Sequence, residues 1–247
     1  MPEMSVVSIE TAYKGKVGLE RRAFCSAFIE KKQDAFRRLE RDVFAKIESN
    51  GERVTCHKGC SACCVAYIQA SIQECEAIVY YLYENPTTLD SFLERYSRWR
   101  ERMRSLGNPF LRCDEVLHQQ YQGELSQSDQ GILLGALSLY QEQDIPCCFL
   151  SDGACSIYSV RPYACVNHYV TTPAAWCRAG DWCEPQSPHR PRIYMTGVDD
   201  LYDISFYHEN LRRPIVGFMP TMVYRILTGG LEYIAELTGF ERLSAKG

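Results

Sequence analysis

The sequence of 247 residues lacks an excess of basic charge, and it also lacks a long uninterrupted apolar run. Its 27 Lys and Arg stand against 31 Asp and Glu, and the formal net charge of −4 provides no general positive field for a nucleic-acid backbone. The longest apolar tract, residues 215–237, is interrupted by Pro220 and Arg225 and falls short of a membrane span. We therefore expect neither a nucleic-acid partner nor a membrane partner.

The motifs of common enzymes are also missing. The sequence contains no G-x-G-x-x-G turn, phosphate loop or His-x-x-x-His pair, and no Ser-His-Asp set stands out. Residues 1–10 contain no basic stretch followed by an apolar run, which predicts no secretory signal and a cytoplasmic protein with reduced thiols. These absences leave open whether the chain is an enzyme.

Cysteine, by contrast, is abundant, with 13 in the chain. Four lie within residues 56–64, which we call the first limb, and others lie within residues 147–165, the second limb, or shortly after it. Thiolates hold Zn²⁺ or anchor iron–sulfur clusters, and either centre needs about four sulfurs brought together by the fold. The spacing therefore predicts two cysteine-rich loops that converge on a metal centre.

The apolar periodicity predicts a mainly α protein with a single domain over residues 1–247. Ser71 and Glu74 form a capping-box pattern, and Ser91 and Glu94 form a second one. A short strand is allowed at residues 192–196, although no stretch alternates long enough to require a sheet. The expected helices cover residues 19–49, 71–84, 91–106, 128–143, 199–212 and 216–237.

The two limbs together resemble the YkgJ-like cysteine-cluster family, a zinc- or iron-chelating domain. The likeness rests on the C-x3-C-x2-C-C run at 56–64, then C-x-F-L from Cys147, G-x-C-x-I-Y from Gly153 and R-P-x-x-C from Arg161. It covers about residues 54–177, with helical extensions over 1–53 and 199–247. The resemblance implies these metal ligands: Cys56, Cys60, Cys63, Cys64, Cys147, Cys155, Cys165 and Cys177.

Two departures from the family pattern leave the ligand set open near its ends. Cys148 stands where a proline is usual, and Val166 stands where a basic residue often follows the last cysteine of the motif. Neighbouring side chains tend to diverge, so the sequence does not decide which of Cys63 and Cys64, or of Cys147 and Cys148, binds metal. The isolated cysteines are expected to pack as small hydrophobes; they are Cys25, Cys75 and Cys113.

Arg161 is the expected cofactor-binding residue outside the thiols. Four thiolates around Zn²⁺ or a 2+ [4Fe–4S] core leave a formal charge of −2, which a nearby guanidinium would offset; the alternative is an ordinary surface arginine before a rigid proline. His57 is expected to point to solvent, and His168 is a candidate ligand or proton carrier near the centre. Tyr158 is expected to pack against the loop.

The all-cysteine ligand set favours an iron–sulfur cluster, of the 4Fe-4S type, with a structural, redox or metal-handling role. Zinc in a structural or interaction module is one alternative. Another is an S-adenosylmethionine-dependent protein lysine methylase, because the family resembles the flagellin lysine N-methylase in its cysteine cluster. A radical S-adenosylmethionine enzyme is disfavoured, since Ala62 occupies the place of the usual aromatic residue. A protein partner that completes the site is also left open.

Overall fold

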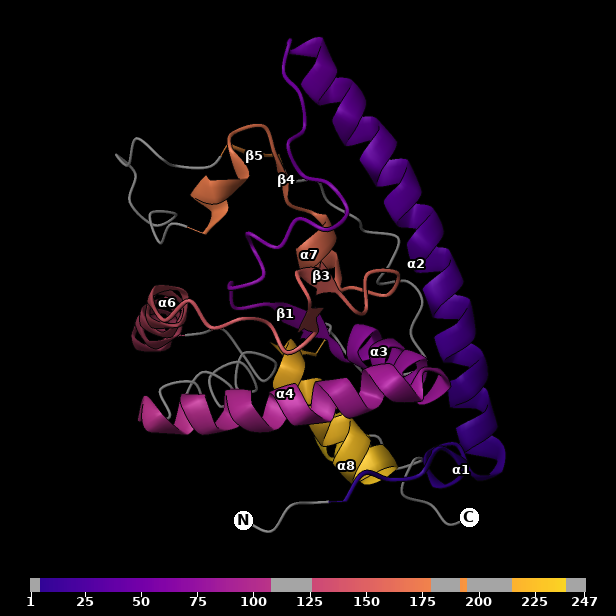
Figure 1. The fold of residues 1–247 in the computed structure, drawn as a ribbon. Coiled ribbons are helices and arrows are strands. Elements are labelled where there is room, and N and C mark those ends of the chain that lie inside the picture. The colour runs from indigo at the N-terminus through magenta and orange to yellow at the C-terminus, as the bar shows by residue number, and fades with distance from the viewer. Residues whose placement is uncertain (1–4, 108–125, 179–191, 195–214, 239–247) are drawn as a thin grey trace.

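The computed structural model describes residues 5–107, 126–178, 192–194 and 215–238 (Figure 1). These residues form a mainly α fold, as the periodicity predicted. The predicted helix 199–212, Cys113 and Cys183 lie outside the described residues. The helices are α1 (Ile9–Ala12), α2 (Gly15–Ser49), α3 (Ile72–Glu84), α4 (Pro86–Ser105), α6 (Gln127–Glu142), α7 (Tyr163–Val166), the 3₁₀ helix η1 (Ala174–Cys177) and α8 (Met219–Thr238).

Short antiparallel strand pairs tie distant parts of the chain together. The strands β1 (Gln69–Ser71) and β6 (Val216–Phe218) pair, so that the chain entering α8 lies beside the chain entering α3. β2 (Leu150–Ser151) pairs with β3 (Ala154–Cys155) within the second limb. β4 (Tyr169–Val170) pairs with β5 (Ile193–Tyr194), which lies where the sequence allowed a strand.

Helix α3 is the centre of the fold, because it packs against α2, α4 and α8. Its capping box is formed as predicted, with the Ser71 hydroxyl accepting from the Glu74 backbone and the Glu74 carboxylate accepting from the Ser71 backbone. Ile72, Ile78 and Leu82 are fully buried. A helix surrounded on several faces must also bury polar side chains, and Glu74 and Glu76 are among its buried residues.

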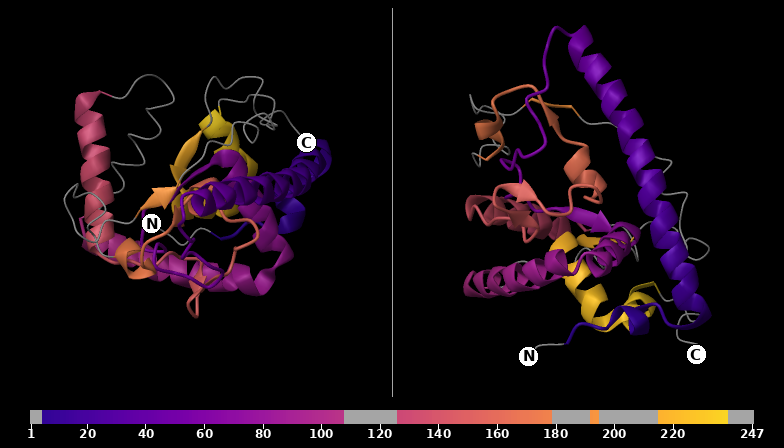
Figure 2. Two further views of the ribbon diagram at one scale, coloured as in Figure 1. Left: turned by 90° about the horizontal axis from the view of Figure 1, so that it is seen from above. Right: turned by 45° about the vertical axis from the view of Figure 1, so that its right-hand side comes forward.

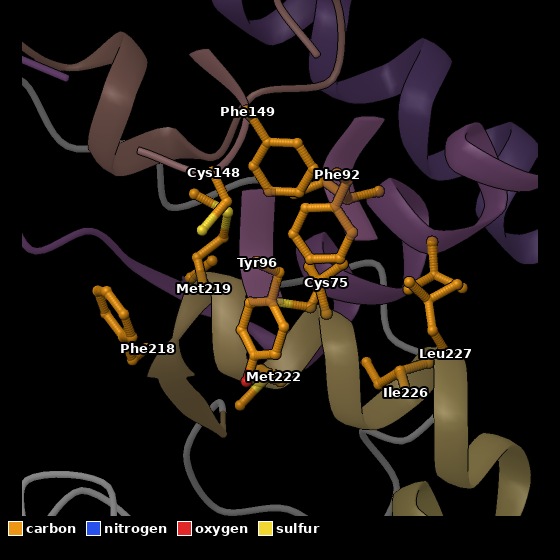
Figure 3. Packing of buried hydrophobic residues seen from close by; sticks show 14 of the residues in the cluster. Cys75, Phe92, Tyr96, Cys148, Phe149, Phe218, Met219, Met222, Ile226 and Leu227 are labelled. Atoms are coloured by element: carbon orange, nitrogen blue, oxygen red, sulfur yellow. The ribbon is translucent and has the colours of Figure 1, made fainter. Parts of the chain in front are cut away.

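The main core joins α3, α4 and α8 to the second limb (Figure 3). Phe149 of the limb stacks on Phe92 of α4 with the ring centroids 4.5 Å apart. Cys75 and Cys148 are buried in the same cluster, together with Met219 at the start of α8. Burial of this apolar surface fixes the second limb against the helices, at about 25 cal/mol for each Å² removed from water.

The predicted helix at 91–106 begins earlier than expected. α4 starts at Pro86 and continues to Ser105, so Ser91 lies inside the helix and does not cap it. Asn85 and Pro86 do end α3, as predicted, but they also open α4, because proline is well tolerated in the first turn, where its missing N–H would have no partner. The turn between α3 and α4 is therefore a single residue, Asn85.

The other helices agree with the periodicity. α2 runs along one side of the molecule, and the chain that leaves its end turns back toward β1 and carries the first limb (Figures 1 and 2). The helix expected over 216–237 begins later than predicted, because Val216–Phe218 pair with β1 as strand β6 and α8 starts at Met219. α8 is interrupted at Gly230, whose φ of 53° is in the left-handed region. Within the described residues, no helix is both long and apolar enough to span a membrane.

Candidate metal centre

The first limb follows α2 as a series of tight turns. The Cys60 N–H donates to the His57 carbonyl at 3.0 Å, and Gly59 adopts a φ of 94° that a side chain would disfavour. The Cys64 N–H donates to the Ser61 carbonyl at 2.9 Å. These turns bring the four thiols of the limb into a short stretch of irregular backbone.

The second limb contains a β-hairpin that positions Cys155. Asp152 and Gly153 form a two-residue loop between β2 and β3, with φ values of 49° and 77°. An Asp-Gly pair with both φ angles positive is the preferred type I′ turn of hairpins. The turn sets Cys155 opposite Leu150 in the hairpin, and Leu150 follows Cys147 by only three residues. The Asp-Gly pair is the local signal from which this hairpin could have been predicted.

The two limbs are hydrogen-bonded to each other at their cysteines. The Cys147 N–H donates to the Cys64 carbonyl at 2.7 Å. At the other end of the first limb, the Val170 N–H donates to the Cys56 sulfur at 3.2 Å, and the Thr55 N–H donates to the Val170 carbonyl at 2.8 Å. The limbs, separated by more than eighty residues of sequence, therefore form one site.

A pocket of about 380 Å³ lies between the limbs. Arg161 and His168 line it, and its remaining wall is largely apolar, with Tyr67 and Ile68 before α3 and Met219 from α8. Met219 was not expected here; only the β1–β6 pairing brings it in, and its N–H donates to the Ile68 carbonyl at 3.0 Å. Six of the eight predicted ligands line the pocket: Cys60, Cys63, Cys64, Cys147, Cys155 and Cys165.

The two other predicted ligands lie next to the pocket. Cys56 is half-buried and also approaches the His168 carbonyl, at 3.6 Å. Cys177 is buried at the end of η1, and burial, with the charges of Cys63 and Cys56 acting in the same direction, raises the pKa of its thiol to about 12. Cys56 belongs to the first limb, and Cys177 lies close enough to that limb for the charges of Cys56 and Cys63 to act on it.

The structure distinguishes Cys147 from Cys148. Cys147 lines the pocket, whereas Cys148 is buried in the apolar core among the residues of α3, α4 and α8. Cys25 and Cys75 are fully buried, as expected of packing cysteines. All eleven cysteines in the described part of the chain are free thiols.

Burial and mutual contact determine the pKa values of the pocket thiols. A hydrogen bond with Cys64 lowers the pKa of Cys63 to about 7, and the same bond raises the pKa of Cys64. Burial raises the pKa of Cys147 to about 12 and also raises the pKa of Cys155 and Cys165. Burial therefore favours the protonated thiols of Cys147, Cys155 and Cys165 over their thiolates.

Arg161 is the cation of the site. Its guanidinium lies over the Tyr158 ring, 3.9 Å from the centroid, which holds it at the pocket wall. Burial raises the pKa of Cys56 and of Cys155, whereas the positive charge of Arg161 acts to lower both pKa values. Arg161 therefore favours the thiolate form of these two cysteines. Its role in offsetting the charge of metal-bound thiolates stays a prediction.

The two histidines of the region differ in their surroundings. His57 is exposed, and its Nδ1 lies 3.1 Å from the Thr55 carbonyl, in agreement with the expectation that it points to solvent. His168 lines the pocket, and its Nδ1 lies 2.6 Å from the Ala164 carbonyl. Burial lowers the pKa of His168, so the imidazole is neutral at physiological pH.

The donor set of the pocket fits a thiophilic metal, because thiolates are the ligands of zinc and of iron–sulfur clusters. Within the described ranges, no group of three Cys, His, Asp or Glu side chains is already arranged to hold a metal ion. The backbone thus brings the thiols to one pocket without setting their ligand geometry.

The fold and the pocket define a cysteine-ligated metal-binding domain. The sequence matches a protein family, CxxCxxCC, described as "Putative zinc- or iron-chelating domain", over residues 55–184, and the chain belongs to this family. The match covers both limbs and more than half of the chain. No curated protein and no solved structure matches the chain. The likeness to the flagellin lysine N-methylase stays a prediction.

Metal uptake is expected to strengthen as the pH rises. Because burial raises the pKa of Cys147 and Cys177 to about 12, these thiols carry protons until metal displaces them, and each displaced proton makes the affinity about tenfold higher per pH unit. Co²⁺ affinity, followed by its thiolate absorption between about pH 6.5 and 8.5, measures this slope. A pH-independent affinity would exclude thiols as the ligands.

Proposed function

We propose that this protein binds an iron–sulfur cluster between its two limbs and uses it in electron transfer or metal handling. The observation that carries the proposal is the pocket lined by six cysteine residues from both limbs. Zinc and cluster binding share this donor chemistry, so the size of the pocket and the number of thiols are the features that favour a cluster.

A single zinc ion needs little room. With Zn–S bonds of about 2.3 Å, four tetrahedral sulfurs lie about 3.8 Å from one another and close directly around the ion. A [4Fe–4S] cluster places four irons and four sulfides inside the same shell of thiolates. A pocket of about 380 Å³ with six cysteines on its wall suits the larger core.

The thiols also divide into two groups by their electrostatic neighbours. The pKa of Cys177 is raised by burial and further by Cys63, Cys56 and Cys60. The pKa of Cys165 is raised by burial and further by Cys147, Cys63 and Cys155. The charge of Cys63 raises the pKa of both Cys177 and Cys165, so Cys63 belongs to both groups. Because the two groups share Cys63, the thiols form one continuous set, and the proposed cluster draws its ligands from the six that line the pocket.

A bound cluster would supply one-electron chemistry to the site, and Arg161 would stabilise the negative charge of its thiolate shell. Tyr67, Phe149 and Met219 keep one side of the pocket apolar, which limits the access of water to that side.

Anaerobic purification followed by metal and sulfide analysis tests the proposal. We expect brown protein with about four irons and four acid-labile sulfides for each filled site. A colourless protein that holds only stoichiometric zinc would contradict the proposal and assign the chain to the zinc-binding members of its class.

A further inference from the structure

A second groove, of about 420 Å³, lies against the same loop that forms the metal pocket. It is bounded by α4 on one side and by residues 143–150 on the other. Cys147 lines both the groove and the metal pocket, so a single stretch of backbone separates them. An occupant of the groove would therefore lie next to a proposed cluster ligand.

The groove carries positive charge although the chain is acidic overall. Arg95, Arg98 and Arg102 of α4 line it, and they lie at helical spacing along one face. Arg95 donates to the Ser151 hydroxyl at 2.8 Å, and Arg102 donates to the Gln143 side-chain carbonyl at 3.3 Å. These neutral partners orient the two guanidinium groups without cancelling their charge.

The acidic group on the wall of the groove is already engaged. Asp144 accepts from Arg178 through both carboxylate oxygens, at 2.7 and 2.9 Å. Arg98 pairs with Glu94, but both side chains are about 70% exposed, so solvent screens the pair. The electrostatic balance in the groove is therefore positive.

Between these charges the groove has an apolar floor. Trp99, Ile145 and Leu150 contribute to its wall, and Trp99 is anchored from below by donating to the Tyr140 hydroxyl at 3.1 Å. Trp99 is 7% exposed and Ile145 is 6% exposed, so they support the groove from beneath, and the three guanidinium groups are what the groove presents to an occupant. Arg95 and Arg102 lie seven residues apart, about 10 Å along the axis of α4, which is more than one small inorganic anion spans but is suited to several carboxylates of a protein surface.

We propose that the groove is the docking surface for an acidic one-electron carrier protein. The inference rests on the proposed iron–sulfur function. The carboxylates of the carrier would lie on Arg95, Arg98 and Arg102, and a cluster held by Cys147 would accept one electron from the reduced carrier across that side of the pocket. The carrier is oxidised by one electron and the cluster is reduced by one electron, so no further reactant is needed.

Stopped-flow reduction of the cluster-loaded protein by a reduced plant-type ferredoxin, used as the acidic carrier, tests the inference. The variant R95Q/R98Q/R102Q is expected to lower the second-order rate constant by at least about tenfold at low salt and to flatten its salt dependence. The matched control, R37Q/R38Q/R41Q, removes three exposed charges from α2 and is expected to change the rate by less than about twofold.

Dithionite, a small reductant, separates the possible failures. If dithionite reduces all three proteins equally while only the groove variant is slow with ferredoxin, the docking surface is supported. Equal rates with ferredoxin, or an equal loss in both variants, would overturn it and leave the proposed function intact. Saturable inhibition by inorganic phosphate at constant ionic strength would instead assign the groove to a small anion. A protein without reducible iron would overturn both proposals.

Discussion

Replacing Cys155 by serine is expected to reduce the metal content of the protein to below about a tenth of the wild-type value, and Cys60→Ser is expected to do the same. Each change removes one thiol from a different limb but from the same pocket. Structural metal binding contributes folding free energy, so both variants should also unfold more readily. Metal and sulfide analysis, together with thermal unfolding of the anaerobically purified proteins, measures both effects.

The controls for these variants are cysteines that do not line the pocket. Cys25→Ala and Cys148→Ala remove buried thiols that lie outside the pocket and are expected to keep full metal content. Each should lower the unfolding free energy by only about 1 kcal/mol, through the small cavity that it leaves. Loss of metal from Cys148→Ala, or full metal in Cys155→Ser, would contradict the placement of the ligands.

The second large effect is expected at Glu74, where a buried ion pair joins α2, α3 and the second limb. The Glu74 carboxylate accepts from the Tyr163 N–H at 2.7 Å and lies 3.9 Å from the Lys32 ammonium. Lys32, with no exposed side-chain surface, donates to the Val160 carbonyl at 3.0 Å. The contacted residues, Val160 and Tyr163, lie on either side of Arg161 and shortly before Cys165 in the sequence. The ion pair therefore holds the part of the second limb that carries Arg161 and Cys165.

Glu74→Gln is expected to lower the unfolding free energy by about 3–5 kcal/mol, because it leaves the Lys32 charge buried without its counter-ion. The double variant Lys32→Met/Glu74→Gln should recover most of this loss, since it no longer contains a buried charge. Chemical denaturation of the three proteins at equal metal content measures the effect.

A surface pair provides the comparison for this experiment. Arg22 and Glu84 also join α2 to α3, at 3.2 Å, but their side chains are 49% and 44% exposed. Glu84→Gln should therefore cost less than about 1 kcal/mol. Equal losses from Glu74→Gln and Glu84→Gln would show that burial of the Lys32–Glu74 pair does not determine its contribution.

The buried pair illustrates why sequence reasoning placed the helices but not their contacts. The apolar spacing along α2 and the capping box of α3 depend on neighbours within a few residues, and both were predicted. The pairing of Lys32 with Glu74 was not predicted, because the two residues lie in different helices and no pattern within either helix links them. They are buried because α3 is enclosed by three helices, which is a property of the packing and not of either helix alone.

The candidate site shows the same difference between what the local sequence predicts and what the packing decides. Clustering of cysteines in two limbs, and the match of both limbs to one family pattern, were sufficient to identify metal-binding chemistry. The choice between Cys147 and Cys148 could not be made from the sequence, since adjacent residues share every local signal. Met219 carried no signal at all, because it reaches the pocket through a strand pair whose members lie more than 140 residues apart.

The sequence by itself determined the helical segments of this protein and the chemistry of its thiols, which are ligands suited to zinc or iron. The tertiary structure alone decided which thiols share a pocket and which are packed into the core. It also decided that Cys147 lines both the metal pocket and the arginine-lined groove. The physical reason is that ligand type is a property of single side chains, whereas a site requires atoms from distant segments to meet, and only long-range packing and hydrogen bonds determine where they do.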